Sequence, residues 1–278
     1  MGSAGCLDRL QACYNYPPNR TACRVMTDNA FLDTALTAAR EAAAVIRRYY
    51  RGNLEVTAKS DRTPVTVADV EAEQVIRRII QSRFPEHGFY GEETGRARMD
   101  SEYLWLVDPI DGTKSFVRQY PFFSTQIALM HDGELILGVS SAPAFDEFAY
   151  AQAGRGAWLN DAPLRVSGVS ALRDATLSTG NIQSLAASDR WSKLGELITR
   201  VNRIRGYGDF YHYHLLAAGK VEAVVESDVN ILDIAALFVI VTEAGGSFTD
   251  LDGLPVGLNT RSVLATNGVL LPQIMSLL

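Results

Sequence analysis

The sequence has few cysteines, and the body of the chain has none. All three lie in the first 23 residues, at Cys6, Cys13 and Cys23, without the close pairing of a zinc-binding motif. The rest of the chain cannot form a disulfide framework, which excludes the class of small disulfide-stabilised secreted domains. The first 25 residues also lack the apolar core of a signal peptide. We therefore expect a flexible N-terminal extension over residues 1–25 and a cytoplasmic protein.

Long hydrophobic runs and an excess of positive charge are also missing. The most apolar helical segment, Ile231–Val241, is too short to cross a bilayer and is interrupted by Asp233. The chain carries 26 lysine and arginine residues against 32 aspartate and glutamate residues, and its net charge of −6 argues against general nucleic-acid binding. We expect neither a membrane nor a nucleic acid as partner. Hydrophobic residues make up 47% of the 278 residues, which is enough for a buried core.

The segment Asp108-Pro109-Ile110-Asp111 is the strongest candidate for a metal site. The apolar run before it predicts a buried strand, so Asp108 is expected to emerge at the strand's end. Pro109 stiffens the turn that presents the two carboxylates. Fixed carboxylates repel each other unless a cation lies between them, and carboxylates with the Ile110 carbonyl suit Mg²⁺. A plain surface turn is the competing interpretation of Asp-x-x-Asp-Gly.

Phosphate binding is indicated by the next residues. Gly112 and Thr113 offer backbone amides without bulk beside the predicted metal ions, and such amides receive phosphate oxygens. Bound metal ions make the electrostatic potential at the site positive, so a protein with net negative charge can still attract a phosphate dianion.

The first half of the chain predicts helices packed on an antiparallel sheet. Apolar residues recur at helical spacing over 29–50 and over 67–84, where Pro85 ends the second helix. Two apolar runs, at 126–130 and 135–139, flank a hairpin turn, and further short strands follow.

The second half alternates strands with helices. We expect strands at 175–179, 203–207 and 221–226, and helices at 189–201, 210–218 and 231–244. The two halves, residues 26–166 and 167–278, should form lobes of one compact unit with the site in the cleft between them.

Six motifs occur in an order and spacing that resemble the inositol monophosphatase superfamily. They are Lys59-Ser60-Asp61, residues 64–69, Gly91-Glu92-Glu93, residues 108–116, residues 232–236 and Glu243-Ala244-Gly245-Gly246. The likeness covers nearly everything after Met26. It implies an α/β protein with the layered α-β-α-β-α sandwich of the inositol monophosphatase and fructose bisphosphatase type. We also expect a homodimer.

The resemblance also implies roles for individual residues. Two or three Mg²⁺ ions would be held by the following groups: Glu92, Asp108, the Ile110 carbonyl, Asp111 and Asp233. Asp69 and Thr113 would orient and deprotonate the attacking water, with Glu92 also serving catalysis, while Asp111, Gly112 and Thr113 would bind the phosphate. Three of the carboxylates have a second interpretation from the residues alone. Asp69 fits a helix capping box, Glu92 an exposed acidic turn, and Asp233 a partner of the helix dipole.

Other features look like the histidinol-phosphate phosphatases of this fold. These are Pro85-Glu86-His87-Gly88 and Gly208-Asp209-Phe210-Tyr211. The Lys-x-Phe after Gly112-Thr113 also looks like phosphatases of 3′-phosphoadenosine 5′-phosphate. One departure is Leu232, where many members carry Trp or Tyr before the last metal-binding Asp.

Carboxylates near the metal ions would suit the ammonium group of histidinol phosphate. Asp209, Glu226 and Asp228 lie in the segment that resembles the family's substrate wall, and the competing interpretation is solvated acids at the ends of elements. Of these we expect Asp209 and Glu226, together with Asp233, to bind the substrate. Lys59 is expected near the phosphate and metals by resemblance. His212 and His214 are two apart on a predicted helix and face different directions, so we expect packing or surface roles and no shared metal.

Together with these resemblances, the sequence predicts a Mg²⁺-dependent phosphomonoester hydrolase. The resemblance to histidinol-phosphate phosphatases implies that it cleaves L-histidinol phosphate in histidine synthesis. Inositol monophosphates and 3′-phosphoadenosine 5′-phosphate remain alternative substrates. A phosphatase fold used as a binding or regulatory module is the alternative of another class.

Overall fold

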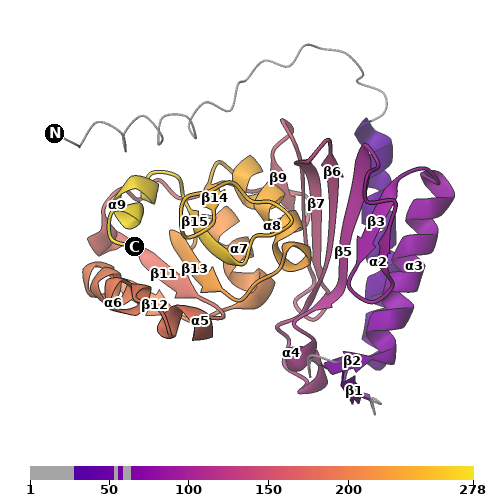
Figure 1. The fold of residues 1–278 in the computed structure, drawn as a ribbon, viewed down its shortest axis with the longest axis horizontal. Helices are drawn as coiled ribbons and strands as arrows, with labels where there is room; N and C mark the ends of the chain where they lie inside the picture. The colour runs from indigo at the N-terminus through magenta and orange to yellow at the C-terminus, as the bar shows by residue number, and fades with distance from the viewer. Residues whose placement is uncertain (1–27, 53–55, 59–63) are drawn as a thin grey trace.

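The computed structural model describes residues 28–52, 56–58 and 64–278, and in them five layers of structure lie side by side (Figure 1). Helices α2 and α3 form one outer layer on an eight-stranded sheet. Helices α7 and α8 lie between this sheet and a five-stranded sheet, and α6 and α9 cover the far side. Three buried apolar clusters fill the spaces between the layers. This order confirms the predicted α-β-α-β-α sandwich.

The outer helices α2 (Asp28–Tyr49) and α3 (Val67–Arg83) agree with the predicted helices to within one residue at each end. Buried alanines on α2, such as Ala35 and Ala42, let the helix pack closely. On α3 the buried face includes Asp69 and Glu73 beside Ala68 and Ala72, whereas Val75 is only half-buried. Acidic residues therefore occupy part of the face of α3 that a purely apolar pattern would fill.

The large sheet has the strand order β10-β9-β8-β7-β6-β5-β3-β4. Its strands are β3 (Gly88–Gly91), β4 (Gly95–Ala97), β5 (Tyr103–Asp111), β6 (Ser124–His131), β7 (Glu134–Ala142), β8 (Glu147–Gln152), β9 (Ala157–Leu159) and β10 (Ala162–Pro163). The predicted hairpin is the β6–β7 pair. The pairing of β3 with β5 is parallel, so the sheet is mixed and not wholly antiparallel as expected. A short separate ribbon joins β1 (Val56–Ala58) to β2 (Pro64–Thr66).

The five-stranded sheet has the order β12-β11-β13-β15-β14. Its strands are β11 (Thr176–Thr179), β12 (Arg203–Arg205), β13 (Ala223–Ser227), β14 (Ser247–Thr249) and β15 (Ser262–Thr266). Strands β11, β12 and β13 run parallel, and β15 pairs antiparallel with β13 and β14. The remaining helices are α4 (Thr113–Val117), η1 (Leu172–Asp174), α5 (Gln183–Ala186), α6 (Arg190–Arg200), α7 (Asp209–Ala217), α8 (Ile231–Glu243) and α9 (Leu271–Met275). The periodicity did not predict α5, β14, β15 or α9.

The middle of helix α8, residues 234–241, is apolar on all sides because the helix is covered on both faces. It packs against the large sheet through β7 and against α7, and nine of its residues are buried. Close approach to β7 requires Gly138, since a Cβ built there would lie 2.3 Å from the Ala236 carbonyl oxygen. At its far end, the Glu243 carboxylate accepts hydrogen bonds from the amides of Gly154 and Gly156. These contacts hold the middle helix to the loops of the first sheet.

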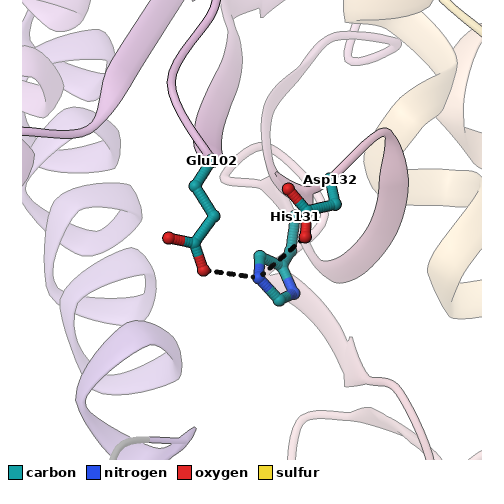
Figure 2. A group of neighbouring side chains, drawn as sticks. All are labelled: Glu102, His131 and Asp132. Carbon is teal, nitrogen blue, oxygen red and sulfur yellow. Dashed lines mark hydrogen bonds and ion pairs between the residues drawn. The ribbon is translucent and has the colours of Figure 1, made fainter.

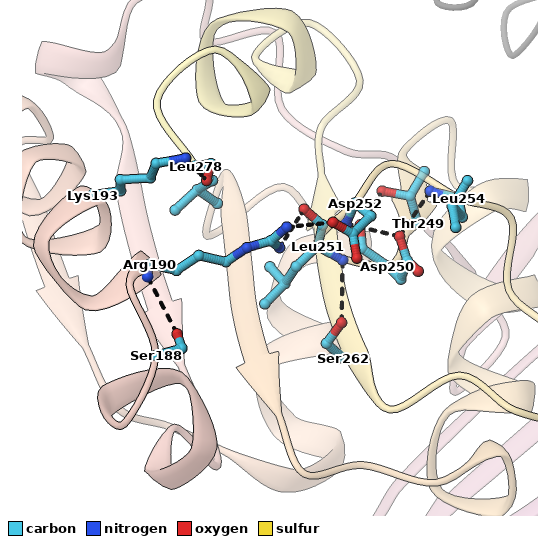
Figure 3. Close-up of polar contacts among 10 residues, drawn as sticks. All are labelled: Ser188, Arg190, Lys193, Thr249, Asp250, Leu251, Asp252, Leu254, Ser262 and Leu278. Carbon is cyan, nitrogen blue, oxygen red and sulfur yellow. Dashed lines mark hydrogen bonds and ion pairs between the residues drawn. The ribbon is translucent and has the colours of Figure 1, made fainter.

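The outer side of the five-stranded sheet is tied together by polar contacts (Figure 3). At the start of α6, Arg190 donates to the Leu251 carbonyl at 2.7 Å and pairs with Asp252. Lys193, one turn later, donates to the Leu278 carbonyl at 2.8 Å. One helix thus holds both the loop after β14 and the last described residue.

Three expectations about the chain's organisation concern the N-terminal extension, membrane spans and the division into lobes. Residues 1–25, with all three cysteines, lie outside the described residues. In the described part of the chain, no helix is long and apolar enough to span a membrane. The division into lobes at residues 166 and 167 stays a prediction.

The approach of α8 to β7 gives a stability prediction. We expect Gly138→Ala to lower the free energy of unfolding by about 1–3 kcal/mol, because the added methyl group overlaps the backbone at Ala236. Gly195→Ala is the control: its Cβ meets nothing within 4 Å, and within α6 alanine should raise stability by about 0.5–1 kcal/mol. Urea denaturation of both variants checks the opposite signs, and a neutral Gly138→Ala would contradict the close contact.

Candidate active site

Strand β5 carries the first two candidate metal ligands at a bulge. Asp108 lies opposite Gln126 and Asp111 lies opposite Ser124, so three steps on β5 match two on β6. The extra residue bends the strand, and the Ile110 amide donates to Asp108 Oδ1 at 2.9 Å. The prediction that Asp108 emerges at the strand's end is therefore corrected: the strand continues to Asp111, and the bulge re-aims the side chains. Asp108 is buried, whereas Asp111 keeps some contact with solvent.

Two further candidate carboxylates each lie in the first turn of a helix and cap it in the same way. Asp69 is the third residue of α3, and its Oδ2 accepts from the Thr66 amide at 2.8 Å and from the Thr66 hydroxyl at 2.5 Å. Asp233 is the third residue of α8, and it accepts from the Asn230 amide at 2.9 Å and from Asn230 Nδ2 at 2.6 Å. Both are capping boxes, which fix a carboxylate at the positive end of a helix. The capping interpretation and a functional role therefore apply to the same side chains.

Thr113 lies between Asp69 and the strand. Its hydroxyl is 3.3 Å from Asp69 Oδ1 and 3.0 Å from the Ile110 carbonyl oxygen. The preceding Gly112 has a φ of +84°, and a Cβ there would lie 2.6 Å from the Phe122 carbonyl oxygen, so only glycine fits. This places the Thr113 hydroxyl beside the one Asp69 oxygen that Thr66 does not use.

Glu92 follows β3 and is positioned by a residue that the sequence analysis missed. The Glu92 amide donates to the Val107 carbonyl at 3.1 Å. The buried carboxylate of Glu73 accepts from the amides of Glu93 and Thr94 at 2.7 and 2.6 Å. The signal that could have found Glu73 is its place four residues after Asp69, on the buried face of α3.

The carboxylates come together across the two halves of the chain. Ligand oxygens of Asp108, Asp111 and Asp233 all lie within 4.8 Å of one another. Burial, then Glu92 and the other two carboxylates, raises the pKa of Asp108 well above its usual value, and a hydrogen bond with Glu92 adds to the shift. Burial, and then Asp233 and other acidic neighbours, does the same to the pKa of Asp111. Burial raises the pKa of Asp233 to about 7 although the Asn230 bonds oppose it.

Such a cluster fits a hard divalent cation. Carboxylates brought together out of water cost free energy unless a cation or protons compensate their charge. The donors at this site are oxygens from carboxylates, with the Ile110 carbonyl adjacent, which is the donor set that Mg²⁺ and similar ions prefer.

Asp209 and Glu226 form a second pair of acids next to the cluster. Glu226, at the end of β13, is 3% exposed, and its Oε1 accepts from the Asn181 amide at 3.1 Å. Asp209 is the first residue of α7, with a φ of +46°. Burial and the charge of Glu226 raise the pKa of Asp209 to about 6. Glu226 also contributes to the raised pKa values of Asp111 and Asp233, so the two groups of acids are close in space.

The histidines and the lysine singled out in the sequence have different outcomes. His212 contacts Glu226 at 3.2 Å, whereas His214 contacts Glu147 at 2.8 Å, so the two rings face different carboxylates as their spacing predicts. Both are buried. Lys59 lies outside the described residues, and its predicted role is not tested.

Glu102, His131 and Asp132 form another cluster, at the opposite end of β5 (Figure 2). His131 Nε2 lies 2.9 Å from Glu102 and 3.7 Å from Asp132, and both carboxylates are largely exposed. The His131 ring also stacks on Tyr103 at 4.3 Å. Exposed ion pairs at the end of a hairpin account for this cluster.

The buried acids predict how stability depends on pH. In a chelator, we expect the melting temperature of Asp233→Asn, relative to that of the unsubstituted protein, to be higher at about pH 7.5 than at about pH 5. The folded protein holds a proton on Asp233 up to about pH 7, whereas the unfolded chain releases it near pH 4. The folded state therefore binds more protons, and its stability falls as pH rises.

Added Mg²⁺ should raise the melting temperature of the unsubstituted protein and have much less effect on Asp233→Asn. Differential scanning calorimetry with EDTA or Mg²⁺ measures both effects. A difference in melting temperature between Asp233→Asn and the unsubstituted protein that does not increase with pH in EDTA would contradict the charge repulsion.

Comparisons with known proteins give relatives over most of the chain. A family model described as the inositol monophosphatase family matches residues 28–278. The chain is 39% identical over 229 residues to a histidinol-phosphatase of Mycobacterium tuberculosis, covering 81% of this chain and 88% of the relative. It is 34% identical over 252 residues to an inositol-1-monophosphatase of Mesorhizobium japonicum, with 88% and 94% covered. The solved structure of the extragenic suppressor protein SuhB from Bartonella henselae matches with a TM-score of 0.83 at 31% identity, covering 89% of this chain and 98% of that one.

Proposed function

The chain belongs to the inositol monophosphatase family and is a phosphatase, and we propose that its substrate is histidinol phosphate. The observation that carries this proposal is a pair of acids, the half-buried Asp209 and the buried Glu226, next to the cluster of Asp108, Asp111 and Asp233. The phosphate of the substrate would lie at the cluster, and its ammonium group between the two acids. The relative from Mycobacterium tuberculosis is named for the same substrate.

We propose Mg²⁺ as the cofactor, with two or three ions. The groups that would hold them are Glu92, Asp108, the Ile110 carbonyl, Asp111 and Asp233. When bound, the metal supplies positive charge that stabilises the phosphoryl oxygens and acidifies water. Burial and mutual repulsion of the carboxylates support this proposal, because a cation removes the cost of ionising them together.

The proton of the attacking water would pass to Asp69. Its Oδ2 is fully engaged by Thr66, which leaves Oδ1, 3.3 Å from the Thr113 hydroxyl, to accept a proton. Burial raises the pKa of Asp69, which makes it a stronger base than a solvated aspartate. The Thr113 hydroxyl would orient the water, and the Gly112 and Thr113 amides would hold phosphate oxygens.

The ammonium group of the substrate gives Asp209 and Glu226 a role that inositol would not require. Two nearby carboxylates repel each other, and this repulsion contributes to the pKa of about 6 at Asp209. A cation between them converts the repulsion into attraction, whereas a hydroxyl only offers hydrogen bonds. Inositol monophosphates remain the second candidate, because the relative from Mesorhizobium japonicum is named for that substrate. The cytoplasmic location and the homodimer stay predictions.

The metal assignment is tested by Asp108→Asn. We expect kcat to fall at least about a hundredfold, because the amide cannot supply negative charge to a cation. The asparagine oxygen can still accept from the Ile110 amide, so the protein should stay folded. Phosphate release and the melting temperature in EDTA measure the two effects. If the variant keeps most of its activity, the assignment of Asp108 as a metal ligand is wrong.

The substrate assignment is tested by Asp209→Asn and Glu226→Gln. Each should lower kcat/KM for histidinol phosphate roughly a hundredfold, because a cation loses its charged partner. Glycerol 2-phosphate, which has no ammonium group, should be affected far less, since the metal and phosphate contacts are common to both substrates. Asp228→Asn is the matched control, because this neighbouring acid is exposed and accepts from the Ser184 amide. Equal losses on both substrates would show that neither acid binds the ammonium group.

A further inference from the structure

His212 is a fully buried imidazole that contacts the proposed substrate-binding acid directly. Its Nε2 lies 3.2 Å from Glu226 Oε2, and its Nδ1 lies 3.3 Å from the Ser178 hydroxyl. The next residue of α7, Tyr213, donates its hydroxyl to the same Glu226 oxygen at 2.7 Å. Both rings are almost completely buried and cross at 88°. Two consecutive side chains of one helix therefore converge on one carboxylate oxygen.

The Glu226 carboxylate accepts hydrogen bonds, so the contact from His212 Nε2 requires a proton on that nitrogen. The Tyr207 amide lies 3.4 Å from the Ser178 hydroxyl oxygen and donates to it. Ser178 can then donate its own proton to His212 Nδ1, which leaves Nε2–H to donate to Glu226. In this arrangement each of the three hydrogen bonds has a donor and an acceptor, and His212 donates Nε2–H to Glu226.

The same series of hydrogen bonds leads toward Asp209, the second proposed substrate-binding acid. Tyr207 lies two residues before Asp209, in the loop that leads into α7. Ser178 is on β11, and Glu226 is on the adjacent parallel strand β13. His212 thus connects the Glu226 carboxylate, through Ser178, to the backbone that carries Asp209. A change at His212 should alter the spacing of the two acids, while Asp108, Asp111 and Asp233 are held by other elements.

We propose that His212 is a positioning residue for substrate specificity: it fixes the Glu226 carboxylate, and with it the distance to Asp209, so that the two acids receive a cationic group. This inference rests on the proposed function. Glu226 has three protein donors, two on Oε2 and one on Oε1. A carboxylate has room for about four, so the fixed orientation leaves capacity for one further donor. A substrate ammonium is that donor in this account.

The test compares His212 with its neighbour His214, because both are buried histidines of α7 with two side-chain partners each. His214 bonds to Glu147 and Ser140 and does not touch Glu226. The variants are His212→Leu, which removes the donor, and His212→Gln, which can place an amide N–H near the position of Nε2. His214→Leu and His214→Gln are the matched controls. The readout is the ratio of kcat/KM for histidinol phosphate to that for glycerol 2-phosphate.

We expect His212→Leu to lower this ratio at least about tenfold, mainly through the KM for histidinol phosphate, since a hydrogen bond to a charged group is lost. His212→Gln should recover most of the ratio. Both His214 variants should leave the ratio within about twofold, even where they lower the melting temperature as much. Ser178→Ala, a small change that removes only the hydroxyl, should lower the ratio about threefold, because Nε2–H is then less strongly favoured.

The outcomes separate this inference from the proposed function. An unsubstituted protein without preference for histidinol phosphate overturns the proposed function, and the positioning role falls with it. A protein with that preference, in which His212→Leu and His214→Leu change the ratio equally, overturns the positioning role alone. The positioning role is also overturned if the ratio of kcat/KM values is no higher in His212→Gln than in His212→Leu, because a hydrogen-bond donor to Glu226 would then have no effect.

Discussion

Repulsion among carboxylates that are crowded together and wholly or partly buried is the constraint around which the site is built. Asp108, Asp111 and Asp233 place oxygens within 4.8 Å of one another, and further acids lie nearby. Their pKa values rise because each ionised group is opposed by burial and by its neighbours. A fold that keeps these groups together without a cation loses stability, so their arrangement makes sense as a place where cations bind.

The fold holds these acids in place largely with hydrogen bonds from backbone amides to their carboxylates. Asp69 and Asp233 are fixed by capping boxes on two different helices, and Asp108 is fixed by the bulge of β5. Burying α8 between the two sheets brings its N-terminus, and so Asp233, to the end of β5. The acids of the proposed ammonium site belong to the second half of the chain. Glu226 lies near the C-terminal end of β13, and Asp209 begins α7. Sites at the carboxyl ends of parallel strands are common in α/β proteins.

Much of the fold and of the carboxylate cluster could be predicted from the sequence, because both depend on strong local signals. Helical periodicity located α2, α3 and α8 to within one or two residues, and the pattern of motifs named the carboxylates that the structure brings together. The short elements β14, β15 and α9 lack a periodic pattern long enough to show, and the bulge in β5 has no local sequence signal. Glu73 and Ser178 were missed because their importance comes from hydrogen bonds between distant segments. Asn230 was missed although its capping box with Asp233 spans only three residues.

Calorimetric titration of the metal-free protein with Mg²⁺ tests the central claim most directly. At about pH 6.5, in buffers that differ in ionisation enthalpy, the number of protons exchanged on binding can be measured. The raised pKa values predict that Mg²⁺ binding releases protons, because at least Asp233, with a pKa of about 7, holds one until the cation displaces it. Release of about one proton or more per site is the expected result. Binding without proton release, or with proton uptake, would show that the carboxylates are already ionised and would contradict the account.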